Sequence, residues 1–126
     1  MARPRFNPDE ILVQLVATAV ECGAEWLEIE YEDGREQVYA GRGCTGVGIA
    51  ALDASGAEAT ALREQLHAAR RRGKPIVVEG VSYRLSVTAY ESFGETAYRV
   101  EIRRDAGTRP TASRGRKPSR PTRRTR

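Results

Sequence analysis

One short segment restricts the fold of this chain more than any other: an alternating strand that runs into Asp33-Gly34. Apolar and polar side chains alternate over residues 25–31, as they do in a strand with one buried face. Asp-Gly is a strong signal of a two-residue hairpin turn, because both residues tolerate positive φ. A return strand over 35–41 then opposes Ile29 to Val38, and the two apolar faces coincide. The segment therefore predicts an antiparallel hairpin with one face in the core.

A helix is expected before this hairpin, over residues of about 8–22. Asn7 can cap it and Pro8 suits the first helical position, where no backbone donor is needed. Gly23 is expected to end this helix, because the residue after a helix commonly adopts a left-handed conformation that glycine favours. Apolar side chains recur at helical spacing along it, at Ile11, Leu12, Leu15, Val16, Ala19 and Val20.

A second helix is expected to open at Ser55, which has capping-box spacing to Glu58. Three consecutive arginines at 70–72 suit the negative end of its dipole, and Gly73 stops it. The buried stripe of this helix is expected to contain Ala59, Leu62, Leu66 and Ala69.

Further strands are expected at about 47–52, 76–79, 81–89 and 96–104, and the glycine-dense segment 41–48 is expected to be a surface loop or bulge. The predicted order is α-β-β-β-α-β-β-β. Hairpins with one polar face indicate an antiparallel sheet whose other face is covered. We therefore expect an α+β fold over 8–104, with two helices packed on one face of a mostly antiparallel sheet, after an N-terminal extension at 1–7.

The last segment, 105–126, contains no large apolar side chain and is expected to be a disordered basic tail. The net charge of +4 divides into +7 in this tail and −3 in the rest of the chain. Contact of about six basic residues with duplex DNA would give a log–log salt slope of about −5. The alternatives are a solubilising appendage or contact with an acidic protein. The predicted polyanion-binding residues are Arg109, Arg114, Arg116, Lys117, Arg120, Arg123, Arg124 and Arg126.

The polar face of the first hairpin is the candidate protein interface. In the register above, Glu28 opposes Tyr39, so Trp26 and Tyr39 lie on neighbouring rungs of a face expected to point outward. Aromatic anchors dominate the energetics of many interfaces. The alternatives are that the tail covers this face or that the strand register differs. A homodimer through this face would be one form of such a contact.

A dinucleotide site is not expected, although Gly41-Arg42-Gly43-Cys44-Thr45-Gly46 matches G-x-G-x-x-G. Such a site needs a helix that begins in the loop and directs its N-terminus at the pyrophosphate. Here the preceding strand belongs to a hairpin and the next residues, 49–52, are expected to form a strand. No cofactor is predicted.

Metal and catalytic chemistry have little support in the residues. His67 is the only histidine, and a zinc site needs three or four ligands. Cys22 is expected to be a small buried filler, whereas Cys44, among glycines, is expected to be exposed. The carboxylates near the first hairpin are expected to form a solvated face rather than an acid–base pair. We therefore expect no enzyme.

No apolar run approaches the length of a transmembrane helix, and the N-terminal residues lack the apolar stretch of a signal peptide. Two cysteines are too few for a disulfide scaffold. Cytoplasmic residence is the expectation.

Three segments, in order, resemble a known family. Residues 23–30 read G-A-E-W-L-E-I-E after an apolar helix, and 31–34 read Y-E-D-G at the hairpin. Residues 83–88 read Y-R-L-S-V-T, and Phe93-Gly94-Glu95 and Arg99 follow. Together they resemble the PAS-like N-terminal domain of the hexameric ATPases of type II secretion and type IV pili. The resemblance covers roughly 9–103.

The departures from this family are specific. The chain has no G-x-x-x-x-G-K-[ST], so the P-loop domain is not present in it. The family's hairpin return strand carries alternate arginines that help to hold nucleotide, and their positions correspond here to Glu36, Val38 and Ala40. The resemblance thus implies a stand-alone relative that keeps the scaffold without the nucleotide contacts.

The expected function is that of a non-catalytic protein-binding or adaptor domain, whose partner would be a secretion or pilus component if the resemblance is functional. The alternative is a small nucleic-acid-associated protein that binds phosphates non-specifically through its tail.

Overall fold

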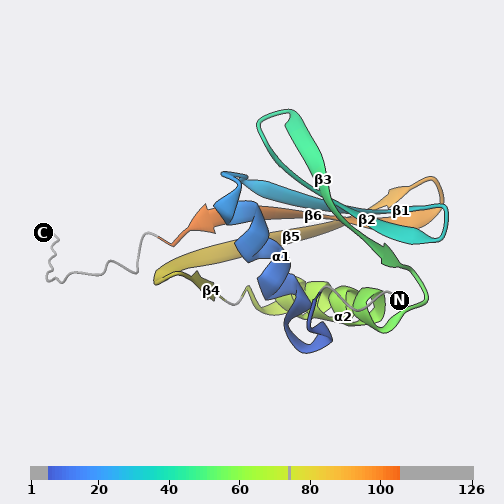
Figure 1. Cartoon of the computed structure of the whole chain (residues 1–126), viewed down its shortest axis with the longest axis horizontal. Helices are drawn as coiled ribbons and strands as arrows, with labels where there is room; N and C mark the ends of the chain where they lie inside the picture. Colours follow the sequence, from blue (N-terminus) through green and yellow to red (C-terminus); the bar gives the residue numbers. More distant parts are fainter. Residues whose placement is uncertain (1–5, 74, 106–126) are drawn as a thin grey trace, which may run out of the picture.

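The computed structural model describes residues 6–73 and 75–105 (Figure 1). A short 3-10 helix, η1 (Pro8–Glu10), precedes the first α-helix, and six strands and a second α-helix follow. Their bounds are α1 (Ile11–Glu21), β1 (Trp26–Glu32), β2 (Arg35–Arg42), β3 (Thr45–Asp53), α2 (Ala57–Arg72), β4 (Pro75–Val78), β5 (Val81–Ser92) and β6 (Glu95–Arg104).

The six strands form one curled sheet in the order β3-β2-β1-β6-β5-β4, and every neighbouring pair is antiparallel. Both α-helices lie on the same side of this sheet (Figure 1). The expected α+β class is confirmed. The two ends of the sheet differ: the β1–β2 and β5–β6 turns lie at one end, and the β4–β5 turn and the end of β6 lie at the other.

The core lies between the helices and the inner face of the sheet. Alternate residues of β1 and β2, such as Leu27, Ile29 and Val38, are fully buried there, because a period of two places them all on one face. The remaining buried apolar side chains come mostly from α1, α2, β5 and β6. This core contains Ile11, Leu12, Leu15, Val16, Ala19, Leu27, Ile29, Val38, Ala40, Ala50, Leu52, Ala59, Leu62, Leu66, Leu85, Val100 and Ile102.

The register of the first hairpin is as predicted, with Ile29 opposite Val38 and Glu28 opposite Tyr39. The turn is formed by Asp33 and Gly34, both at positive φ. The start of the first helical segment is also confirmed, since the Asn7 side chain accepts a hydrogen bond of 3.0 Å from the backbone N–H of Asp9. Gly23, at φ +80°, follows the end of α1.

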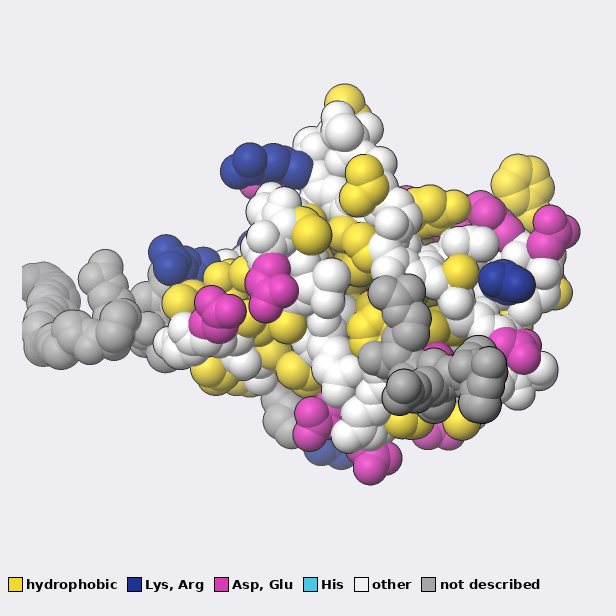
Figure 2. All heavy atoms as spheres, viewed as in Figure 1, with side chains coloured by type: hydrophobic (Ala, Val, Ile, Leu, Met, Phe, Trp, Pro, Cys, Tyr) yellow, Lys and Arg dark blue, Asp and Glu magenta, His cyan; other side chains and the backbone are white. Residues whose placement is uncertain are grey.

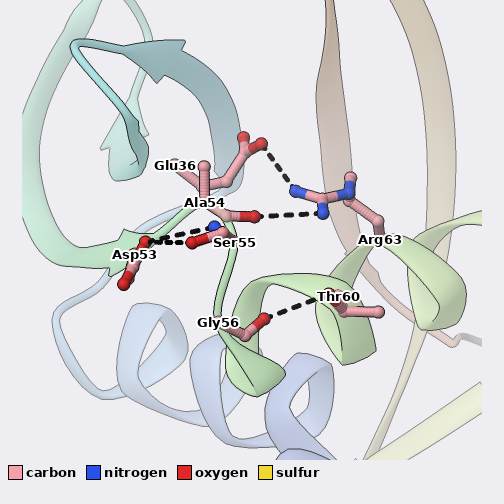
Figure 3. Close-up of polar contacts among 7 residues, drawn as sticks. All are labelled: Glu36, Asp53, Ala54, Ser55, Gly56, Thr60 and Arg63. Atoms are coloured by element: carbon pink, nitrogen blue, oxygen red, sulfur yellow. Dashed lines mark hydrogen bonds and ion pairs between the residues drawn. The ribbon is translucent and has the colours of Figure 1, made fainter.

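The capping box expected at Ser55 does not form. Helix α2 begins at Ala57 with Gly56 as its N-cap, and Ser55 instead donates its backbone N–H and hydroxyl to the carboxylate of Asp53 (Figure 3). The carboxylate of Glu58 accepts a hydrogen bond from the backbone N–H of Phe6. The prediction was wrong because Ser55 forms an Asx-type turn with Asp53 at the end of β3 and is therefore not the N-cap of α2.

The glycine-dense segment is not a loop. Strand β3 begins at Thr45 and pairs with β2 as far as Asp53, with a bulge opposite the Val38–Tyr39 step. Only Gly43 and Cys44 remain as a two-residue turn, with positive φ at Gly43, as in a type II′ turn. The prediction of a short strand over 47–52 was therefore too narrow.

The last hairpin is also longer than expected. Strand β5 continues to Ser92, which pairs with Glu95, so the turn contracts to Phe93 and Gly94. Strand β4, at the outer edge, pairs with β5 alone. Within the described residues, no helix is both long and apolar enough to cross a membrane.

Candidate functional site

Trp26, the expected interface anchor, is not exposed. Only 8% of its surface is accessible. Its ring lies against the backbone of Gly41 and Gly46, and its Nε1 donates a hydrogen bond of 3.0 Å to the carbonyl of Gly43. The prediction of an outward aromatic was wrong because the β2–β3 hairpin curls over this end of the helix-free face. The absence of side chains at the two glycines provides the room for the indole.

Arg99 closes the other side of this indole, with its guanidinium carbon 4.6 Å from the ring centroid. The guanidinium is held by two carboxylates, Glu28 at 2.6 Å and Glu101 at 2.8 Å. The hydrogen bond to Glu101, followed by that to Glu28, raises the pKa of Arg99 against the opposing effect of burial. Glu28, a predicted interface residue, is therefore half-buried and already paired.

Tyr39 and Tyr90 lie on the same helix-free face as Glu28. The Tyr39 hydroxyl lies 3.4 Å from both carboxylate oxygens of Glu32, and burial together with that carboxylate raises the pKa of Tyr39. The Tyr90 hydroxyl lies 3.3 Å from Glu30, and partial burial with the charges of Glu28 and Glu30 raises the pKa of Tyr90. The polar groups of this face thus satisfy one another.

Phe93 is the residue that stands out most from the folded surface. It is fully exposed, at 103% relative accessibility, at the tip of the β5–β6 hairpin. Its φ is +52°, a left-handed conformation that is unfavourable for a bulky side chain. Sequence reasoning placed Phe93 in a turn but did not single it out. An aromatic residue at the first central position of a two-residue X-Gly turn was the available signal.

Acidic residues surround this tip. Glu91 and Glu95 flank it on the same hairpin, and Glu32 and Asp33 lie on the adjacent β1–β2 hairpin, all exposed. Figure 2 shows a hydrophobic protrusion beside acidic side chains at this end of the molecule. Among the described residues none of these four carboxylates forms an ion pair. We call Phe93 with these four acids the acidic tip.

Arginines gather at the opposite end of the sheet. Arg72, Arg84, Arg103 and Arg104 line one hollow of about 510 Å³. Arg84 is oriented by the carboxylate of Asp105 at 3.4 Å and by the carbonyl of Gly73 at 3.3 Å. We call these four residues the arginine hollow.

The return-strand positions that the resemblance would align with nucleotide-holding arginines face the core. Val38 and Ala40 are buried, and Glu36 is 6% exposed with an ion pair of 2.8 Å to Arg63 of α2 (Figure 3). Arg63 also donates to the carbonyl of Ala54, which fixes the loop before α2. The Glu36–Arg63 ion pair therefore links strand β2 to helix α2.

The metal-ligand candidates of the sequence lie apart in the described part of the chain. No set of three His, Cys, Asp or Glu side chains in residues 6–73 and 75–105 could hold a metal ion. His67 is exposed. Cys44 is exposed as predicted, but Cys22 is also exposed, because it caps α1 beyond the last buried turn. The G-x-G-x-x-G residues belong to the β2–β3 hairpin, where no helix begins.

The predicted polyanion residues of the tail, Arg109, Arg114, Arg116, Lys117, Arg120, Arg123, Arg124 and Arg126, lie outside the described residues. No family model matches the sequence, and no curated protein matches it. The likeness to secretion ATPases therefore rests on the three segments quoted above.

Proposed function

We propose that this protein is a non-catalytic adaptor that binds another protein through the acidic tip. The observation that carries this proposal is the complete exposure of Phe93. A phenylalanine in water forgoes about 1.5–3 kcal/mol of burial energy, and its left-handed backbone adds strain. Both costs are understandable if the side chain is buried in a complex.

The hairpin would present Phe93 as a pre-organised anchor. Strands β5 and β6 pair along their whole length up to Ser92 and Glu95, so little conformational entropy would be lost when the tip docks. Aromatic anchors that enter a pocket supply much of the binding energy of protein interfaces. The carboxylates around the tip, which form no ion pair with a described residue, favour a partner whose apolar pocket has a basic rim.

The relationship to the PAS-like domain of secretion and pilus ATPases is part of this proposal, as is cytoplasmic residence. The α+β architecture and the polar, internally paired outer face of the sheet are compatible with a small docking module. Loss of the family's nucleotide arginines supports a role in binding rather than in an ATPase cycle.

Site-specific photo-crosslinking in the source organism tests the proposal. A benzophenone amino acid replaces Phe93 in one full-length protein and Val77 in a control; Val77 is 64% exposed on edge strand β4. We expect one discrete protein adduct from position 93 and none from position 77. The same adducts from both positions, or none from position 93, would refute docking through the tip. A secretion or pilus component in the adduct would make the family resemblance functional, whereas a second copy of this chain would indicate a homodimer.

A second function, non-specific binding of nucleic acid through the tail, is favoured by a separate observation. Residues 105–126 carry eight Lys/Arg and one acidic residue. Binding of this kind weakens steeply with salt, whereas docking of Phe93 in an apolar pocket depends on salt only through the carboxylates of the acidic tip. Titration with labelled duplex DNA and with the crosslinked partner at several salt concentrations separates the two functions.

A further inference from the structure

Arginines from three separate segments lie at one end of the fold, and four of them line the arginine hollow. Arg70, Arg71 and Arg72 form the last turn of α2, Arg84 belongs to β5, and Arg103 and Arg104 end β6. Strand pairing sets Arg84 opposite Arg103, and the end of α2 completes the hollow. The fold thereby places Arg72, Arg84 and Arg103, each at least 12 residues from the next in sequence, around one concave surface.

Most of this charge is uncompensated within the described part of the chain. Arg84 pairs with Asp105, but no ion pair between described residues involves Arg72, Arg103 or Arg104. Elsewhere Arg42, Arg63 and Arg99 each have a carboxylate partner, whereas Arg35 forms no ion pair with a described residue. The chain has 17 acidic residues, so partners were available to it. Like charges that line one hollow repel one another, and an anion bound between them relieves that repulsion.

The helix dipole explains only part of the cluster. Cations are favoured at a helix C-terminus, which accounts for the three arginines of α2. It does not account for the arginines of β5 and β6, which extend over the sheet end. The positions of Arg84, Arg103 and Arg104 therefore need an explanation other than the helix dipole.

We propose that the arginine hollow binds phosphate groups of a nucleic-acid backbone. Guanidinium groups bind phosphate with two parallel hydrogen bonds, and a concave surface with several of them suits a chain of phosphates. The hollow contains no aromatic side chain among its lining residues, so it has no stacking platform for bases and would not read sequence. The described chain ends at Asp105, which lines the hollow and pairs with Arg84, and the sequence beyond it carries eight further Lys/Arg.

This inference deepens the second function above and does not depend on docking of Phe93. It assigns phosphate contacts to the folded domain, where the sequence alone indicated only the tail. The full-length chain is therefore used throughout, and the charges of the hollow and of the tail are changed separately.

The first experiment measures binding of a fluorescent 20-base-pair DNA duplex by anisotropy between about 50 and 200 mM NaCl. The variant R103Q/R104Q is compared with R35Q/R42Q, which removes the same charge from exposed strand positions outside the hollow. We expect R103Q/R104Q to weaken binding about tenfold near 0.1 M salt and to flatten the log–log slope by about 2. The control is expected to change affinity less than about twofold. Equal losses in both variants, or no loss in R103Q/R104Q, would overturn the proposal.

A second variant tests whether the hollow acts without the tail charges. All eight Lys/Arg from Arg109 to Arg126 are replaced by glutamine in the full-length chain. We expect weak residual DNA binding at low salt that disappears when R103Q/R104Q is added. Residual binding that is unchanged by R103Q/R104Q would refute the hollow as its source.

Lipid headgroups also carry phosphate, so vesicles of phosphatidylcholine with phosphatidylserine form the third arm. We expect R103Q/R104Q to affect DNA binding more than vesicle binding. Loss of vesicle binding with unchanged DNA binding would overturn the assignment to nucleic acid. The variant Phe93→Asn is expected to bind DNA like the wild-type protein, so failure of the hollow and failure of the acidic tip are distinguishable.

Discussion

The guanidinium of Arg99 lies over the indole of Trp26, 4.6 Å from the ring centroid. The arginine is held there by Glu28 and Glu101, and the indole is enclosed on its other side by the β2–β3 hairpin. A cation over a tryptophan face contributes about 0.5–2 kcal/mol, depending on its desolvation. Because Trp26 is the only tryptophan, its fluorescence reports directly on this arrangement during unfolding.

Replacement of Gly41 by alanine is expected to destabilise the fold by about 1–3 kcal/mol. A Cβ at this position would overlap the Trp26 ring and the carbonyl of Thr45, and the backbone there cannot easily move. Gly48 is the matched control, because a Cβ there would meet only the Tyr39 ring at 3.8 Å. Urea unfolding followed by tryptophan fluorescence compares Gly41→Ala with Gly48→Ala. Equal stabilities of the two variants would contradict the close packing of the indole.

The variant Phe93→Asn is expected to stabilise the isolated protein by about 0.5–1 kcal/mol while abolishing the crosslinked complex. Asparagine tolerates the left-handed conformation that Phe93 adopts at φ +52°. Phe93→Tyr keeps the ring and the strain, and its stability should match that of the wild type within about 0.5 kcal/mol. Thermal unfolding and partner binding are measured together. A Phe93→Asn protein that is less stable than wild type would show that Phe93 is held by contacts within the fold.

The variant Arg63→Met is expected to destabilise the protein by about 1–3 kcal/mol. It leaves the buried carboxylate of Glu36 without its partner at 2.8 Å. The estimate is below that for a fully buried pair because the Arg63 side chain is 38% exposed. The double variant Glu36→Leu/Arg63→Met should recover most of the loss, since no buried charge remains. Chemical unfolding of Glu36→Leu, Arg63→Met and the double variant gives the coupling free energy between the two side chains. A double-variant effect equal to the sum of the two single effects would argue against this ion pair.

Stability is expected to fall in acid partly through Asp53. Hydrogen bonds from the backbone N–H and then the hydroxyl of Ser55 hold the pKa of Asp53 below its ordinary value. Because the pKa is lower in the folded state, the carboxylate stabilises the fold above its unfolded pKa of about 3.9. This contribution is lost as the pH falls through the folded-state pKa.

Urea midpoints of the wild type and of Asp53→Asn should therefore differ most above about pH 5 and converge only as the pH falls through the folded-state pKa of Asp53, which lies below about 3.9. Ser55→Ala removes one of the two hydrogen bonds and should show a smaller difference over the same range. A gap between wild type and Asp53→Asn that stays constant down to about pH 2 would assign the effect to something other than ionisation.

Local patterns determined much of the fold. The β1–β2 register follows from the alternation around Ile29 and Val38 and from the two-residue turn that Asp33-Gly34 favours. The start of η1 follows from Asn7 and the end of α1 from Gly23, because capping depends on residues within one turn of the helix. Such features are predictable because all the interacting groups lie close together in sequence.

The tertiary structure alone decided which surfaces are free. The alternation around Trp26 placed it on the polar face, but its burial depends on a hairpin that folds back over it and on an arginine 73 residues later in the chain, held by the pairing of β1 with β6. The N-cap of α2 is a separate case, because the competition for Ser55 between Asp53 and the capping box is local in sequence. The arginine hollow likewise exists only because the sheet brings the ends of α2, β5 and β6 together. Period and propensity assign a side chain to a face, whereas its exposure and its charged neighbours depend on long-range packing that neither encodes.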